Sequence, residues 1–79
     1  MQLNKAVSYR LIQLMSERQM TTYMLFTQTG LAKTTVYNMV ASKHEAANLK
    51  SIYVICQGLG ITLEEFFNSP LFANENLDP

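Results

Sequence analysis

Residues 21–39 read TTYMLFTQTGLAKTTVYNM, and this stretch decides the fold. Gly30 separates two short helical patterns, because glycine adopts the left-handed conformation that ends a helix at little steric cost. Apolar residues at spacings of 6, 5 and 3 hold one predicted helix against the other: Leu25, Leu31, Val36 and Met39. The residues between them must point outward and carry ammonium, hydroxyl and amide groups: Lys33, Thr34, Tyr37 and Asn38. Such a face has the chemistry for reading DNA bases.

The two helices differ in how their first turns are capped. The Thr21 hydroxyl is placed to cap the first helix, which ends at Gly30. The second helix is expected over residues 33–41, but Ala32 at its N-cap position has no capping group. Lys33 also places a positive charge at the positive end of the helix dipole. Because local defects in an otherwise consistent sequence accompany function, we expect residues 33–41 to carry a functional surface.

The remaining patterns predict three more short helices. Residues 4–17 repeat apolar side chains on one face, and Asn48 caps a helix with a strong apolar stripe that includes Cys56. Gly58 and Gly60 are expected to end that helix. Thr62 and Glu65 form a capping box for a last helix. The sequence therefore predicts an all-α domain of five short helices.

Size and composition narrow the possible functions. A chain of 79 residues holds one modest core and no walled catalytic cleft, so we do not expect an enzyme. One cysteine and one histidine cannot build a metal site, and we expect no metal or cofactor. No apolar run approaches the roughly 20 residues needed to cross a bilayer. The N-terminus lacks the apolar segment of a signal peptide, which predicts a cytoplasmic protein.

The net charge is zero, but its distribution is uneven. Residues 1–50 contain six basic and two acidic residues, Glu17 and Glu45, a net charge of +4. Residues 51–79 contain four acidic residues and no basic one, a net charge of −4. Such a chain can present its basic end to DNA phosphates, although ordinary scatter of surface charge in a small protein gives the same count.

The C-terminal apolar residues are too numerous for one face of a two-turn helix: Leu63, Phe66, Phe67, Leu71 and Phe72. Exposed apolar residues on a monomer indicate an interface, so we expect a homodimer through this segment. The alternative is that Pro70 turns the chain back and covers the monomer's own core. With the dimer interpretation, residues 1–72 form the domain with its dimerisation extension, and residues 73–79 form an acidic, flexible tail.

Two segments resemble the Cro/C1-type helix-turn-helix family, the lambda-repressor-like DNA-binding domains. The first is ERQMTTxxLxxxTGLAKTTVxxM at residues 17–39, and the second is NLKSIxxICxxLGITLEEFF at residues 48–67. Together the resemblance covers about residues 7–67. It implies a helix-turn-helix fold and a transcriptional regulator, expected to be a repressor. Such a protein would bind a short inverted repeat of double-stranded DNA as a homodimer.

The resemblance also implies roles for individual residues. The helix at about residues 33–41 would enter the major groove and read bases through Lys33, Thr34, Tyr37 and Asn38. Lys33 would donate to guanine O6 and N7, and Asn38 would pair with adenine N6 and N7. Phosphate contacts are expected at the start of the preceding helix and after the recognition helix: Thr22, Thr35 and Lys43.

Departures from the family pattern leave a second interpretation open. The family usually has alanine where this chain has Phe26, so the phenyl ring must push two helices apart or turn outward. Tyr37 would then either contact DNA or pack against Phe26. Together with Ala32 and the neutral net charge, Phe26 supports a protein-interaction module on the same fold, such as an antitoxin-like or other partner-binding subunit without DNA binding.

Overall fold

Helices account for the regular structure of the computed structural model, which describes residues 1–44 and 46–79. The five α-helices are α1 (Leu3–Glu17), α2 (Thr22–Thr29), α3 (Lys33–Ala41), α4 (Leu49–Leu59) and α5 (Leu63–Phe67). Two 3-10 helices follow, η1 (Pro70–Phe72) and η2 (Asn74–Asn76). The described residues contain no strand, which confirms the predicted all-α class. Glu45, which the sequence places in a polar loop after α3, lies outside the described residues.

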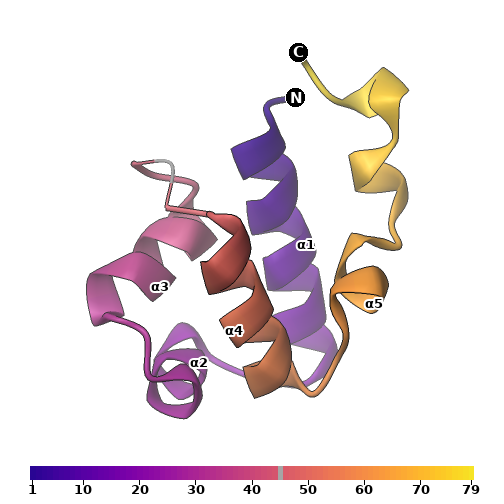
Figure 1. Cartoon of the computed structure of the whole chain (residues 1–79). Helices are drawn as coiled ribbons and strands as arrows, with labels where there is room; N and C mark the ends of the chain where they lie inside the picture. The colour runs from indigo at the N-terminus through magenta and orange to yellow at the C-terminus, as the bar shows by residue number, and fades with distance from the viewer. Residues whose placement is uncertain (45) are drawn as a thin grey trace.

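The helices enclose one core. In Figure 1, α2 and α3 lie to one side of α1, and α5 with the C-terminal turns lies to the other. α1 packs against α3 and η1, α2 packs against α3 and α4, and α4 packs against α5. The largest side chains that are fully buried come from five helices: Val7, Leu11, Leu25, Val36, Ile55, Cys56 and Phe66.

The capping signals read from the sequence are present. The side chains of Thr21, Asn48 and Thr62 each accept a hydrogen bond from the backbone N–H three residues later. Thr62 and Glu65 complete the predicted capping box. Gly30 has φ +73° at the end of α2, so the predicted glycine turn is confirmed. These contacts fix both ends of α2 before any tertiary packing is considered.

The sequence suggested that Gly58 and Gly60 together end α4, but only Gly60 does. α4 continues through Leu59 and ends at Gly60, which has φ +75°. Gly58 instead lies where α4 meets α2, because a Cβ at this position would be 2.9 Å from Thr29 Cγ2. That distance is too short for real carbon atoms, so the glycine permits the close packing of α2 on α4.

The aromatic residues of the C-terminal segment meet one another. The Phe66 and Phe67 rings lie 5.1 Å apart, and the Phe67 and Phe72 rings lie 4.9 Å apart, both edge-to-face. The sequence placed Phe66 in a dimer interface. The side chain is only 1% exposed and belongs to the core, so it has no surface to offer a second subunit. Leu63, Phe67, Leu71 and Phe72 are half-buried. The turn at Pro70 brings Phe72 against the monomer's own core, while these four side chains keep part of their surface exposed.

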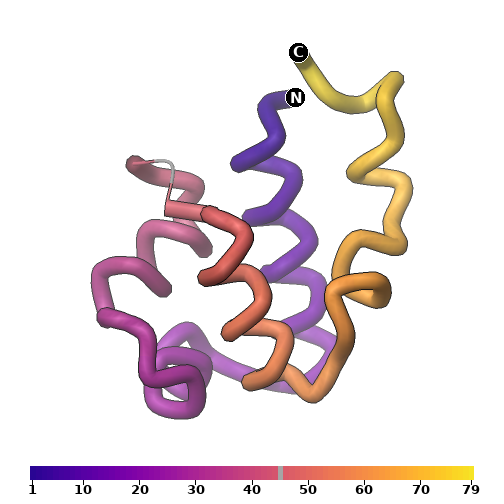
Figure 2. Tube along the Cα trace, viewed as in Figure 1, coloured from indigo at the N-terminus to yellow at the C-terminus, as the bar shows by residue number. Residues whose placement is uncertain are grey.

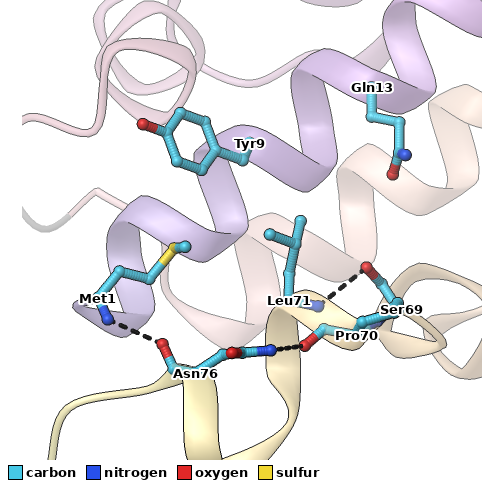
Figure 3. A pocket seen from close by; sticks show the side chains of 7 residues that line it. All are labelled: Met1, Tyr9, Gln13, Ser69, Pro70, Leu71 and Asn76. Carbon is cyan, nitrogen blue, oxygen red and sulfur yellow. Dashed lines mark hydrogen bonds between the residues drawn. The ribbon is translucent and has the colours of Figure 1, made fainter.

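Residues 73–79, expected to form a flexible tail, contact the beginning of the chain. The Asp78 N–H donates to the Met1 carbonyl at 2.8 Å, and the Cα trace brings the two ends together (Figure 2). Asn76 Nδ2 donates to the Pro70 carbonyl at 2.6 Å. Figure 3 shows the Asn76–Pro70 bond, together with a bond of 2.8 Å from the Met1 ammonium to the Asn76 carbonyl, beside an open hollow lined by Tyr9 of α1 and by Leu71. The tail thus lies beside the N-terminus of the chain.

Cys56 is a core residue, as its place on the apolar stripe predicted. The side chain is 1% exposed. Burial raises the pKa of the Cys56 thiol above its ordinary value, and the nearby Glu65 carboxylate raises it further. Because the thiolate is the reactive form of cysteine, both effects keep this thiol inert.

Candidate nucleic-acid interface

α3 has a buried side and an exposed side. Val36 and Met39 are buried against the core. Lys33, Thr34 and Tyr37 are exposed on the other side. Asn38 is on the same side and half-buried. The four residues predicted to read bases therefore share one outward face, because positions 33, 34, 37 and 38 fall within less than half a turn of a helix.

Two of these residues contact each other. The Lys33 ammonium lies over the Tyr37 ring, 5.7 Å from its centroid. Phe26 packs against the core, and its ring pairs with Tyr23 at 6.0 Å. Among the described residues, Tyr37 is therefore paired with a cation rather than with Phe26. The Phe26 side chain is thus accommodated between the core and Tyr23, a neighbour on α2.

The position of α3 depends on a residue that sequence reasoning missed. The Ser8 hydroxyl of α1 donates to the Val40 carbonyl in the last turn of α3. Ser8 is only 4% exposed, although serine is polar. A buried hydroxyl needs a partner, and here the partner is a carbonyl at the end of α3. The signal in the sequence was a serine directly beside the apolar stripe of α1.

The first turn of α3 lacks a side-chain cap, as predicted. Ala32 is the N-cap residue and provides no oxygen for the first N–H groups. Ala32 and Lys33 are both exposed. Because the first four N–H groups of a helix have no partner within the helix, they depend on solvent or a ligand here.

The three residues expected to contact phosphates lie around this face. Thr22 begins α2, is half-buried, and lines a hollow together with Val40 of α3. Thr35 is half-buried on the flank of α3. Lys43 is exposed in the loop after α3, where its N–H donates to the Asn38 carbonyl at 2.8 Å. That bond holds the start of the loop against the end of α3.

The positive charge of the N-terminal half is not gathered on this face. Arg10 of α1 donates to the carbonyls of Phe66 at 2.7 Å and Glu65 at 2.8 Å, at the end of α5. Arg18 donates to the Leu59 carbonyl at 3.2 Å, at the end of α4. Cations are favourable at helix C-termini, where the dipole is negative. Both arginines thus support the fold, which leaves lysines as the cations of α3 and its loop.

A family model matches residues 10–70, described as a Cro/C1-type helix-turn-helix DNA-binding domain. The chain belongs to this family. The Cro/C1-type domain is also similar to a solved structure, the crystal structure of the prophage Lp1 protein 11, with a TM-score of 0.80 and 28% sequence identity. That alignment covers 89% of this chain and 93% of the other. No protein with a curated description matches the sequence.

Among the residues that the structure describes, no group of three or more histidine, cysteine or acidic side chains could hold a metal ion. Within the same residues, no helix is long and apolar enough to cross a membrane. The matched range ends at Pro70, so the end of η1 and all of η2 lie beyond the family model.

Proposed function

We propose that this Cro/C1-type domain is a sequence-specific transcriptional repressor in the cytoplasm that occupies promoter DNA and blocks RNA polymerase. The observation that carries the proposal is the outward face of α3, where Lys33, Thr34, Tyr37 and Asn38 are accessible together. Their ammonium, hydroxyl and amide groups complement the donors and acceptors that bases expose in the major groove. α3 is the second helix of the motif, the position that enters the groove in helix-turn-helix proteins.

We assign the two kinds of contact to different residues. Lys33 reads guanine, Asn38 reads adenine, and the Thr34 methyl meets the methyl group of thymine. Thr22, Thr35 and Lys43 bind phosphates, which fixes the register of α3 without reading sequence. The first turn of α2 favours an anion because its N–H groups and its dipole both point toward the phosphate.

The proposed active form is a homodimer on a short inverted repeat. Two recognition helices would then enter successive major grooves about 34 Å apart. The C-terminal segment supplies the interface through its half-buried apolar side chains: Leu63, Phe67, Leu71 and Phe72. Phe66 contributes from within the core by supporting Phe67 and Phe72, whose rings lie 5.1 and 6.1 Å from its own.

The test is selection of a random duplex pool by the purified protein at about 100 mM salt, a concentration at which phosphate contacts alone hold many sequences weakly. We expect a palindromic motif with half-sites one helical turn apart. Light scattering of the protein in the same salt concentration should report a dimer. Recovery of no motif by a folded protein would contradict the proposal, and a monomer on a single half-site would contradict the dimer alone.

Two substitutions separate base reading from phosphate binding on the selected duplex. Asn38→Ala should cost about 1–3 kcal/mol of binding free energy and relax the preference at one base pair. Lys43→Ala should weaken all sequences alike and reduce the salt slope by about one. If both variants changed affinity and specificity in the same way, the division between base and phosphate contacts would be wrong.

A protein-interaction module is the alternative function, and one observation favours it. Arg10 and Arg18 bond backbone carbonyls, so fewer cations remain to bind DNA. Salt dependence distinguishes the two functions. A dimer that contacts about 6–8 phosphates should show a log–log slope of roughly −5 to −7, whereas an interaction module would bind DNA weakly at any salt concentration.

A further inference from the structure

Lys33 and Tyr37 lie one helical turn apart on the outward face of α3. The Lys33 Nζ is 5.7 Å from the centroid of the Tyr37 ring, within the range of a cation–π contact. Side chains of a helix lean toward its N-terminus. The Tyr37 ring therefore covers the surface beside Lys33, while both side chains remain exposed.

The position of Lys33 in the helix favours contact between its ammonium and this ring. Lys33 is the first residue of α3, where the positive end of the helix dipole disfavours a cation. Ala32, the N-cap, offers no side-chain oxygen that could attract the ammonium to the helix end. The negative face of an aromatic ring attracts a cation. Tyr37 thus holds the charge over the outward face and away from the helix end.

We propose that Tyr37 is a positioning residue that presents the Lys33 ammonium to a base, so that the two residues read DNA as one unit. This inference rests on the proposed DNA-binding function. The chemistry recognised is the pair of acceptors on guanine, O6 and N7. A lysine has a flexible stem and loses rotamer freedom when it binds. A lysine already held over the groove-facing surface loses less, and therefore distinguishes guanine from other bases better.

The chain contains a matched control on another helix. Lys5 and Tyr9 of α1 have the same spacing, and Lys5 Nζ is 6.0 Å from the Tyr9 ring centroid. Tyr9 is 47% exposed and faces the hollow beside the C-terminal turns rather than the outward side of α3 (Figure 3). Tyr9→Leu removes the same kind of contact without touching the recognition face. Any general effect of losing an exposed lysine–tyrosine pair should appear in this variant.

The first measurement uses the free protein. In the NMR spectrum, the ε-methylene protons of Lys33 should be shifted upfield by the Tyr37 ring. The shift should disappear in Tyr37→Leu and persist in Tyr37→Phe, which keeps the ring face. Unshifted Lys33 protons in the wild-type protein would overturn the inference before DNA is added.

The second measurement is a double-mutant cycle on the selected duplex with Lys33→Met, Tyr37→Leu and both substitutions. In the wild-type background, Tyr37→Leu should reduce the preference for guanine at the position that depends on Lys33 by about two- to fivefold, the range expected for an exposed cation–π contact. In the Lys33→Met background, the same substitution should have no effect on that position. Tyr37→Phe, which keeps the ring, should retain the wild-type preference for guanine, and Tyr9→Leu should leave it unchanged.

The outcomes separate this inference from the proposed function. A selected motif with independent effects of the two substitutions would overturn the pairing and leave the regulator intact. A wild-type protein that selects no motif would overturn the proposed function and with it this role of Tyr37. Loss of guanine preference in Tyr9→Leu as well would attribute the effect to general destabilisation and also overturn the inference.

Discussion

The α2–α3 unit and the C-terminal segment reach their structures in different ways. α2 is bounded by Thr21 and Gly30, both adjacent to it in sequence. α5 has only five residues, and its last carbonyls accept from Arg10, which is 55 and 56 positions away. Both ends of α2 are thus specified by neighbouring residues, whereas the end of α5 depends on a side chain of α1. Short helices are marginal alone, so α5 owes its position to these tertiary contacts.

The two regions also use their large side chains differently. α3 leaves polar side chains and Tyr37 exposed and buries only Val36 and Met39. The C-terminal segment buries Phe66 and packs Phe67 and Phe72 against it. α3 thus presents a polar face to solvent, whereas the C-terminal segment completes the core on the other side of α1 (Figure 1).

The largest expected effect is loss of the aromatic centre of the C-terminal segment. Phe66→Ala should reduce the free energy of unfolding by about 3–5 kcal/mol, because it removes a fully buried ring and leaves a cavity. Tyr23→Ala removes an exposed ring on α2 and should cost far less. Urea unfolding followed by circular dichroism measures both. Equal losses would show that the C-terminal segment is not part of the core.

Arg10→Lys tests the dependence of α5 on α1. The lysine keeps the charge but loses the planar fork that bonds two carbonyls, so we expect a loss of about 1.5–3 kcal/mol of unfolding free energy. Arg18→Lys is the matched control, since Arg18 makes longer bonds of 3.2 and 3.3 Å to carbonyls. Thermal unfolding at one salt concentration compares them. A smaller loss for Arg10→Lys than for Arg18→Lys would contradict the special role of Arg10.

A double-mutant cycle at Gly58 and Thr29 tests the contact between α2 and α4. Gly58→Ala should cost about 1–2 kcal/mol, because steric overlap with Thr29 Cγ2 exceeds the gain in helix propensity. In the Thr29→Ser background that methyl group is absent while the hydroxyl remains, so the alanine should be neutral or stabilising by up to about 1 kcal/mol. Urea unfolding of the four proteins gives the coupling. If the two substitutions changed the free energy of unfolding additively, close packing against Thr29 would not be the reason for glycine at position 58.

The smallest effect concerns the missing cap of the recognition helix. Ala32→Ser should stabilise the domain by about 1 kcal/mol, because its hydroxyl can accept from the first turn of α3. Thr21→Ala removes an existing cap from α2 and should destabilise by a similar amount. Thermal unfolding measures both variants, and duplex binding shows what the added cap does to affinity. If Ala32→Ser did not stabilise the domain, the first N–H groups of α3 would already have other hydrogen-bond partners.

Prediction from sequence succeeded where the cause lies within a few residues. The helix order, the three N-caps, the glycine turn and the outward face of α3 were all predictable. The role of Gly58 was not, because its reason is Thr29 on another helix. Phe66 was predicted to lie in a dimer interface. Its burial was not predictable, because it depends on the return of the chain at Pro70, which brings the Phe72 ring beside it. The assignments of single residues to bases and phosphates remain predictions.

By itself, the sequence determined the all-α class, the helix order and the family to which the chain belongs, because caps, glycine turns and apolar periodicity act over one or two helical turns. Only the tertiary structure decided which cations support the fold, where Ser8 anchors α3, and how the C-terminal aromatic residues are buried. It also placed the Lys33 ammonium over the Tyr37 ring. Such contacts depend on side-chain direction and on partners distant in sequence, and residue spacing alone does not set these.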